Sequence, residues 1–129
     1  MAHPNEILLR KGYDAFGKGD LETLRAMFAP DVVWHVAGKS ALSGSYKGLD
    51  EVFGFFAEIV QRSGGTFANE VHDIVAGDAH AIALTTARAE REGRRLHNPG
   101  VGIFHIKNGK VTEAWLTSQD QYAADEFWA

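Results

Sequence analysis

The sequence predicts an α+β domain in which helices pack on one face of a curved antiparallel sheet. Apolar residues recur at helical spacing in three segments of the first half of the chain. Four segments rich in strand-forming residues follow in the second half, and short turns join them. Because the chain has 129 residues, we expect residues 1–129 to form a single domain.

The chain begins with two predicted helices. Asn5 is a suitable N-cap for the first helix, and the segment 17–19, with its two glycines, ends it. Asp20 is the predicted N-cap of a second, shorter helix. That helix ends before Pro30, because the residue that precedes a proline is pushed out of the helical region.

A short strand, a loop and a third helix come next. Residues 31–36 are β-branched and aromatic, which is typical of a strand. Residues 37–48 are rich in glycine and serine and are predicted to form a loop. The third helix begins near residues 49–50 and ends at residues 63–65. Its predicted apolar stripe consists of Val52, Phe53, Phe56, Ile59 and Val60.

The second half is predicted to be a meander of four strands. Asn108-Gly109 is the strongest hairpin signal in the chain, because both residues tolerate the positive φ of a type I′ turn. The tail, residues 122–128, is predicted to form a last helical turn. The four strands are expected at residues 66–75, 80–90, 96–106 and 111–117.

Curvature of such a sheet opens a cone between the sheet and the helices. Gly100 and Gly102 have the same strand parity as Phe104, which indicates either space left in the interior or a tight bend. Val101 and Ile103 have the opposite parity, so an apolar outer face is expected to form a homodimer. Aromatic side chains are expected either to line the cone as a pocket for a small hydrophobic molecule or to fill it: Trp34, Phe53, Phe56, Phe104 and Trp115.

Composition excludes several classes of function. Thirteen Lys and Arg against 17 Asp and Glu leave a net charge of −4, so no nucleic-acid partner is expected. The chain has no cysteine, which excludes disulfides, thiolate catalysis and cysteine-based metal sites. Neither a signal peptide nor the roughly 18 apolar residues of a membrane span is found, so a cytoplasmic protein without membrane partners is expected.

Three ionisable residues could carry acid/base chemistry, two of them on the second strand of the meander and one after its fourth strand. Arg88 and Glu90 lie two residues apart on a strand and share a face. If Ile82 and Leu84 face the core, that face points toward the mouth of the cone, where Asp120 could complete a carboxylate–guanidinium–carboxylate cluster. Such a cluster could separate two carboxylates into an acid and a base. The alternative is a solvated ion pair, with Asp120 starting the C-terminal turn.

Two further residues are candidates for polar roles. Tyr13 is either a hydrogen-bond donor from the first helix or a core residue with its hydroxyl at the rim. His35 is either a base or a surface histidine, since strand alternation places it on the face opposite Trp34. The histidines have no recognised ligand spacing, and no cofactor fingerprint occurs, so neither a metal nor a cofactor is expected.

Short motifs along nearly the whole chain match one family pattern. They are Tyr13–Phe16, Gly19–Asp20 with Leu24, Phe28–Trp34, Gly44–Gly48, Phe104–Ile106, Asn108–Val111 and Trp115. Together they resemble the SnoaL-like branch of the cystatin-like, cone-shaped superfamily named after nuclear transport factor 2. The resemblance implies three N-terminal helices packed on a curved sheet, a site inside the cone and dimerisation through the outer sheet face.

The resembled families include ketosteroid isomerases, polyketide cyclases, limonene epoxide hydrolases and binding modules without chemistry. The three catalytic positions of ketosteroid isomerases fall on Gly12, on Val36 and near Gly102, which excludes that machinery. Limonene epoxide hydrolases carry Arg-x-Asp on a strand and a second Asp five residues beyond a Trp. The chain matches these at 88–90, with Glu in place of Asp, and at Asp120. The residues that hold the water in that family fall on Trp34 and Val36, which cannot form the same hydrogen bonds.

The leading hypothesis is a cofactor-independent acid/base enzyme that isomerises, cyclises or opens an epoxide in a small hydrophobic substrate. Asp120 is its candidate base, Glu90 its acid and Arg88 the bridge, with Tyr13 and His35 as polar partners. The substrate-binding candidates are Trp34, Phe53, Phe56, Gly102, Phe104 and Trp115. The alternatives are a binding module for a lipophilic metabolite and a dimerisation domain without a cavity.

Overall fold

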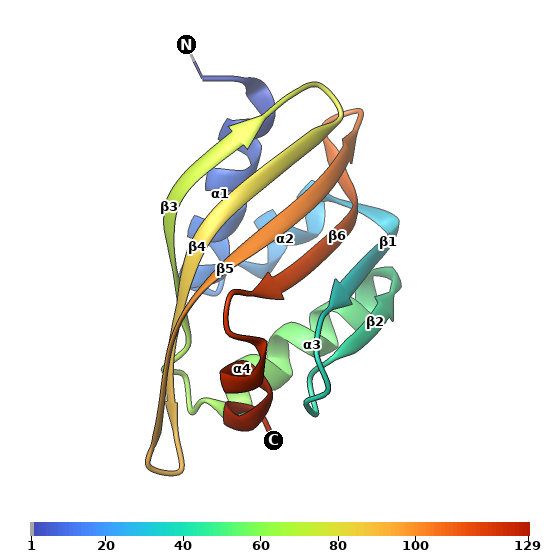
Figure 1. Ribbon diagram of the computed structural model, residues 1–129. Helices are drawn as coiled ribbons and strands as arrows, with labels where there is room; N and C mark the ends of the chain where they lie inside the picture. Colours follow the sequence, from blue (N-terminus) through green and yellow to red (C-terminus); the bar gives the residue numbers. More distant parts are fainter. Residues whose placement is uncertain (1) are drawn as a thin grey trace.

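The computed structural model describes residues 2–129. Its first half contains α1 (Pro4–Lys18), α2 (Leu21–Met27), β1 (Phe28–Val36), β2 (Gly44–Lys47) and α3 (Gly48–Arg62). Its second half contains β3 (Ala68–Ala76), β4 (His80–Arg91), β5 (Arg94–Lys107), β6 (Lys110–Ser118) and α4 (Gln121–Phe127). The predicted α+β class is confirmed, with three N-terminal helices and a four-stranded meander (Figure 1).

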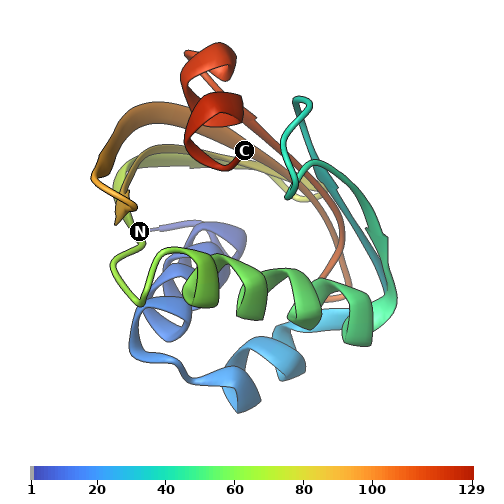
Figure 2. The ribbon, with the colours of Figure 1, turned by 90° about the horizontal axis from the view of Figure 1, so that it is seen from below.

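One curved sheet contains the six described strands, in the order β2-β1-β6-β5-β4-β3. Neighbouring strands are antiparallel except β1 and β6, which pair in parallel, so the predicted purely antiparallel sheet is corrected there. Figure 2 shows the sheet arching over α1, α2 and α3. The concave face of the sheet and these three helices therefore enclose the interior of the molecule.

Local side-chain chemistry defines the boundary between α1 and α2. The Asp20 carboxylate accepts a hydrogen bond from the Thr23 N–H at 3.1 Å, which confirms Asp20 as the N-cap of α2. Gly19 ends α1 with a φ of 71°, a left-handed conformation that glycine adopts without steric penalty. Each of these features depends on one or two neighbouring residues, so both could be predicted from the sequence.

The predicted N-cap of α1 is wrong. His3 is the cap, and its Nδ1 accepts a hydrogen bond from the Asn5 N–H at 3.0 Å. Asn5 lies inside the helix, and its side-chain amide donates to the carbonyls of Gly77 and Asp78 at 2.9 and 3.1 Å. Asn5 therefore ties the start of α1 to the turn between β3 and β4, a long-range contact without a local signal.

The segment predicted to be a loop contains the edge strand β2. Its residues pair with β1 from Val36 opposite Gly44 to Val33 opposite Lys47. The four residues of β2 show no alternation of apolar and polar side chains, because an exposed edge strand has no strongly buried face. The third helix matches its prediction in extent, but Phe55 is buried in place of Val60.

Two of the turns in the meander have the backbone conformation of tight hairpins. Asn108 and Gly109 have φ values of 53° and 75°, which confirms the predicted hairpin between β5 and β6. Glu92 and Gly93, between β4 and β5, have φ values of 51° and 77°. The meander is therefore set by short local turns.

The inner face of β4 differs from the prediction. Ala81, Ala83 and Ala89 are buried, whereas Ile82 and Leu84 are 39% and 41% exposed on the opposite, outer face. Small side chains on the inner face leave room for the aromatic side chains that enter from the helices. The expectation that Ile82 and Leu84 face the core is wrong.

Candidate ligand cavity

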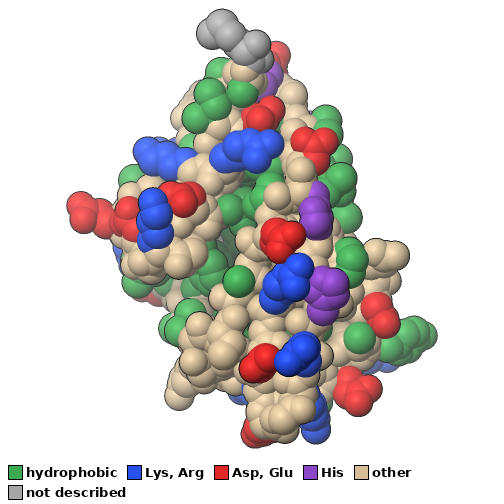
Figure 3. Space-filling view, turned by 90° about the vertical axis from the view of Figure 1, so that its left-hand side faces the viewer, with side chains coloured by type: hydrophobic (Ala, Val, Ile, Leu, Met, Phe, Trp, Pro, Cys, Tyr) green, Lys and Arg blue, Asp and Glu red, His purple; other side chains and the backbone are tan. Residues whose placement is uncertain are grey.

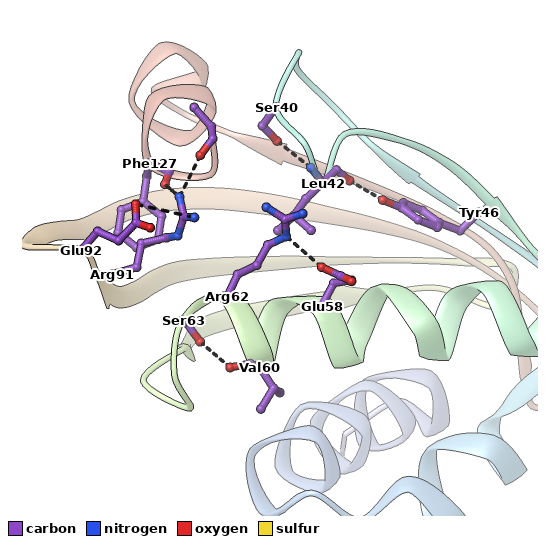
Figure 4. Close-up of polar contacts among 11 residues, drawn as sticks. Ser40, Leu42, Tyr46, Glu58, Val60, Arg62, Ser63, Arg91, Glu92 and Phe127 are labelled. Carbon is purple, nitrogen blue, oxygen red and sulfur yellow. Dashed lines mark hydrogen bonds and ion pairs between the residues drawn. The ribbon is translucent and has the colours of Figure 1, made fainter.

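A cavity of about 200 Å³ lies between the concave face of the sheet and the helices. One end of it is lined by the segment after β1, with Ser40 and Leu42, and by Gln121 and Trp128 from the C-terminal region. Figure 4 shows this end, where Arg62 projects from α3 toward the segment that carries Leu42.

Within residues 2–129, no helix is both long and apolar enough to cross a membrane.

The cavity lining is mostly aromatic and aliphatic, and it is uncharged. No Asp, Glu, Lys, Arg or His side chain of residues 2–129 belongs to it. Trp34 contacts Phe56 and Phe104 at ring-centroid distances of 5.3 and 5.9 Å. The aromatic side chains of the lining are Tyr13, Phe16, Phe28, Trp34, Phe55, Phe56, Phe67, Phe104 and Trp128.

Tyr13 places a hydroxyl group in this apolar lining, from the middle of α1. Burial raises the pKa of the Tyr13 hydroxyl above its ordinary value, so the hydroxyl is neutral near physiological pH. The hydroxyl also approaches β5 closely. A Cβ atom at Gly102 would lie 3.0 Å from Tyr13 Oη and 2.8 Å from Phe104 Cε2. Gly102 is therefore needed for the close approach of two aromatic side chains to the strand.

Trp34 contributes a second polar group. Its side chain lines the cavity, is 7% exposed, and its Nε1 atom has no hydrogen-bond partner among the described residues. An indole N–H can only donate, and a buried donor without a partner is costly and rare. The Trp34 N–H is therefore a buried donor enclosed by packed side chains, although other atoms of the same ring line the cavity.

Seven further polar side chains of the lining were missed by sequence analysis: Ser40, Asn69, Thr85, Asn98, Thr117, Ser118 and Gln121. Thr85 has the parity of Ala81 and Ala83 on β4, so a correct assignment of the inner face would have found it. The Asn98 amide is already used, because it donates to the Asp120 carbonyl at 2.8 Å and accepts from the Asp120 N–H at 3.2 Å.

The helix α4 is fixed at the end of the cavity by arginines of the β4–β5 hairpin. Arg91 Nη1 donates to the carbonyls of Phe127 and Ala129 at 2.8 and 2.9 Å (Figure 4). Arg94 Nη1 donates to the Glu126 carbonyl at 2.8 Å. These bonds satisfy carbonyl groups that a helix C-terminus leaves without partners.

The predicted carboxylate–guanidinium–carboxylate cluster is not formed, because its members lie on the outside of the molecule. Arg88 pairs with Glu70 at 3.1 Å, and Glu90 pairs with Arg95 at 3.3 Å. Figure 3 shows acidic and basic side chains lying next to each other on this side of the molecule. The outward parity of β4 carries Arg88 and Glu90 away from the cavity, so the solvated-pair alternative describes them.

Asp120 is the N-cap of α4 and is exposed. Its carboxylate accepts a hydrogen bond from the Ala123 N–H at 3.0 Å, and its side chain does not line the cavity. The prediction of a catalytic base at this position is corrected: the side chain starts the C-terminal helix, which is the alternative reading of the same position.

His35 and Trp115 stack on the outer face of the sheet, at a centroid distance of 5.3 Å. His35 Nε2 lies 2.6 Å from a Glu113 carboxylate oxygen, and His35 Nδ1 lies 2.8 Å from Ser45 Oγ. The parallel register of β1 and β6 places His35 directly opposite Trp115. Both residues are therefore excluded from the cavity lining, contrary to the expectations of a cavity base and a cavity wall.

Phe53 also lies outside the lining. Its ring packs against Phe28 and Phe56 at 6.1 and 5.6 Å, and the Arg25 guanidinium lies 4.7 Å above it. The structure thus brings five of the candidate residues together around the cavity: Tyr13, Trp34, Phe56, Gly102 and Phe104. It places the other six elsewhere: Arg88, Glu90, Asp120, His35, Trp115 and Phe53.

Comparison with known proteins identifies relatives over nearly the full chain. An uncharacterized protein of Mycobacterium tuberculosis is 32% identical over 123 residues, which cover 95% of this chain and 94% of the relative. The structure of Bal32a, from a soil-derived mobile gene cassette, superposes with a TM-score of 0.95 at 35% identity and covers 98% of this chain and 97% of that one.

A protein of unknown function with a cystatin-like fold, from Xanthomonas campestris, superposes with a TM-score of 0.89 at 30% identity and covers 95% of each chain. The family description "SnoaL-like domain" matches residues 9–114. This match includes most of the helices, the strands and the cavity lining, so the predicted resemblance is confirmed. The chain belongs to the SnoaL-like domain family.

Proposed function

We propose that this protein binds a small, uncharged, hydrophobic molecule in the cavity between the sheet and the helices. The observation that carries the proposal is a mostly aromatic and aliphatic lining without a charged side chain among the described residues. Moving an ion into such a site is costly when no opposite charge compensates for the lost hydration. A neutral ligand avoids this cost and gains from burial of its apolar surface.

The volume of the cavity limits the size of the ligand. An engineered apolar cavity of about 150 Å³ stays dry and holds a benzene molecule. The cavity of this protein is somewhat larger, at about 200 Å³. We therefore propose a ligand of one or two rings.

Tryptophan fluorescence tests binding, because Trp34 and Trp128 line the cavity and the third tryptophan, Trp115, does not. Titration with tetralin, a neutral hydrocarbon of two fused rings, should change the emission saturably. The change should persist in Trp115→Phe, which retains both cavity tryptophans.

A cavity-filling variant supplies the decisive comparison. Ala87 lines the cavity, so Ala87→Phe should abolish the titration. Ala57 is exposed on α3 outside the lining, so Ala57→Phe is the matched control and should bind like the wild type. Absence of saturable binding, or equal binding by Ala87→Phe and the wild type, would refute the proposal.

A cofactor-independent isomerase or cyclase is the second candidate. The family resemblance implies such enzymes, and one observation favours it: a neutral Tyr13 hydroxyl in an apolar cavity. A fixed donor of this kind stabilises the negative charge that develops on a carbonyl oxygen during enolisation. The proton that leaves the neighbouring carbon would pass to solvent water, because no described carboxylate or imidazole lines the cavity. With Arg88, Glu90 and Asp120 outside the lining, an epoxide hydrolase reaction at those residues is not proposed.

Isotope exchange distinguishes the second candidate from simple binding. The protein should accelerate the exchange of deuterium from D₂O into the carbon next to the carbonyl of 2-tetralone, measured by NMR. Loss of a single oxyanion donor typically lowers a rate by about 10²–10³-fold, so Tyr13→Phe should show a reduction of that order. If exchange with the wild type equals the exchange in buffer while 2-tetralone is bound, the protein binds this ketone without catalysing its enolisation.

A further inference from the structure

The loop between β1 and β2 covers one end of the cavity. Leu42 lies in this loop, lines the cavity and is 4% exposed. Figure 2 shows the loop beside α4. We infer that residues 38–44 form a hinged lid that opens to admit the ligand and closes over it. The inference rests on the proposed function and specifies how a ligand reaches the cavity.

Entry of a ligand at this end requires a movement of the chain. Leu42, Ala124 and Trp128 line the cavity here, and all three side chains are buried. Side chains in a protein interior are close-packed, with few gaps larger than a water molecule. A molecule of one or two rings therefore passes here only when the loop or α4 moves.

The helix α4 is firmly held. Carbonyl groups at its C-terminal end accept three hydrogen bonds from Arg91 and Arg94. Asn98 forms two more with the backbone of Asp120, which immediately precedes the helix. A movement of α4 would break these bonds, so α4 is the fixed side of the opening.

The loop has fewer attachments. The Tyr46 hydroxyl donates to the Leu42 carbonyl at 2.7 Å (Figure 4), and Ser43 Oγ donates to the Ala37 carbonyl at 2.9 Å. Both bonds stay within the β1–β2 hairpin, and no hydrogen bond among residues 2–129 joins residues 38–43 to another element. Closure of the loop therefore depends mainly on burial of the Leu42 side chain.

The loop is braced internally and has a glycine at each end. The Ser43 N–H donates to the Ser40 carbonyl at 3.1 Å, and the Ser40 N–H donates to Ser43 Oγ at 2.9 Å, which ties the loop into one piece. Gly38 and Gly44 have φ values of 99° and 136°, in a region that glycine enters without steric penalty. Hinges are a few terminal residues that absorb a backbone change, so these two glycines are suitable hinges.

An engineered disulfide tests the lid, because the chain contains no cysteine. A Cβ atom at Gly38 would lie 3.0 Å from Asp125 Cγ on α4, which is close to the separation between a Cβ atom and the second sulfur of a disulfide. The double variant Gly38→Cys, Asp125→Cys should therefore immobilise this hinge when it is oxidised.

Stopped-flow tryptophan fluorescence measures the effect of this bond on the binding of tetralin. Oxidation of the double variant should lower both the association and the dissociation rate constants about ten-fold or more, because a lid that cannot open blocks entry and exit alike. Reduction should restore both constants. The reduced form of the same protein is the matched control.

Leu42→Ala supplies a second test that does not depend on a disulfide. Closure of this variant buries less apolar surface, so the open form is more populated and the association rate constant should rise about ten-fold. A lost contact between Leu42 and the ligand would by itself act mainly on the dissociation rate constant, so association reports on the lid.

Ile74→Ala is the matched control for Leu42→Ala. Ile74 is also 4% exposed, but it does not line the cavity. A comparable loss of buried apolar surface occurs in both variants, and only Leu42→Ala weakens the lid. Ile74→Ala should therefore keep the wild-type association rate constant for tetralin.

The outcomes separate the lid from the proposed function. If tetralin binds, oxidation leaves the rate constants of the double variant unchanged and Leu42→Ala associates as fast as Ile74→Ala, the lid is wrong while the proposed binding function stands. If the double variant does not fold, the association rate constant of Leu42→Ala decides alone. If tetralin does not bind to the wild type, the proposed function and the lid that serves it are both wrong.

Discussion

The substitution Gly102→Ala tests how tightly the cavity wall is packed. A Cβ atom at this position would lie 2.8 and 3.0 Å from two atoms of the Phe104 ring and 3.0 Å from Tyr13 Oη. Phe104 is only 4% exposed and packs against Tyr13 and Trp34, so its ring has little room to move away. We expect an overpacking penalty of about 1–3 kcal/mol.

This penalty translates into a measurable melting shift. An unfolding entropy of about 2.1 cal/mol/K per residue amounts to about 0.27 kcal/mol/K for this chain. A penalty of about 2 kcal/mol therefore lowers Tm by about 7 °C. Differential scanning calorimetry gives the shift, and urea unfolding gives the free energy of unfolding independently.

Gly54→Ala is the matched control. Gly54 lies on the exposed face of α3, and a Cβ there meets nothing within 4 Å. Alanine is the better helix former, so this control should gain about 0.5–1 kcal/mol. If Gly102→Ala is as stable as the wild type and binds tetralin with unchanged affinity, the described contacts of Phe104 and Tyr13 do not constrain the cavity wall, and this explanation of Gly102 is wrong.

Three further predictions concern other residues of the account. Burial raises the pKa of Tyr13, so the unfolded chain loses the hydroxyl proton at a lower pH than the folded chain does. The contribution of this group to the free energy of unfolding is therefore fully present below about pH 10 and falls as the pH rises beyond that value. Tyr13→Phe should remove about 1 kcal/mol of the loss in stability between pH 9 and pH 11, measured by urea unfolding, and an unchanged slope would contradict the burial of this hydroxyl. Asp120→Ala removes the cap from the Ala123 N–H and should lower the free energy of unfolding by about 1 kcal/mol while tetralin affinity persists; abolished binding at full stability would restore a direct role for Asp120. His35→Ala removes the contact with Glu113 on the outer face and should leave the affinity for tetralin unchanged in a fluorescence titration. A loss of tetralin affinity would instead place His35 at the ligand-binding site.

Elements of the fold that depend on nearby residues could be predicted from the sequence. The Asp20 cap, the left-handed Gly19 and the Asn108-Gly109 hairpin each arise from one or two residues and their backbone preferences. The cap of α1 could not be found in this way, because Asn5 is recruited by the β3–β4 turn more than 70 residues away.

The location of the site was harder to predict because it depends on which face of each strand turns inward. On β4, the larger Ile82 and Leu84 suggested the inner face, but alanines occupy it because aromatic side chains from α1 and α3 fill the space opposite. Because the inner and outer faces of β4 were assigned the wrong way round, Arg88 and Glu90 were expected at the cavity mouth. In the structure both side chains are exposed to solvent.

The two tryptophans of β1 and β6 show a second limit. Trp34 and Trp115 were both expected to line the cone, but the parallel register of the strands pairs Trp115 with His35 on the outer face. Pairing between residues about 80 positions apart has no local signature in one sequence. By contrast, the shared parity of Gly102 and Phe104 within one strand correctly indicated that both face the interior.

A crystal structure of the protein with a brominated tetralin, located by the anomalous signal of bromine, tests ligand binding in the cavity most directly. We expect one molecule in the cavity, in contact with the apolar side chains of the lining, among them Phe56 and Phe104. A ligand bound only on the outer sheet face, or a cavity closed by side chains, would contradict it.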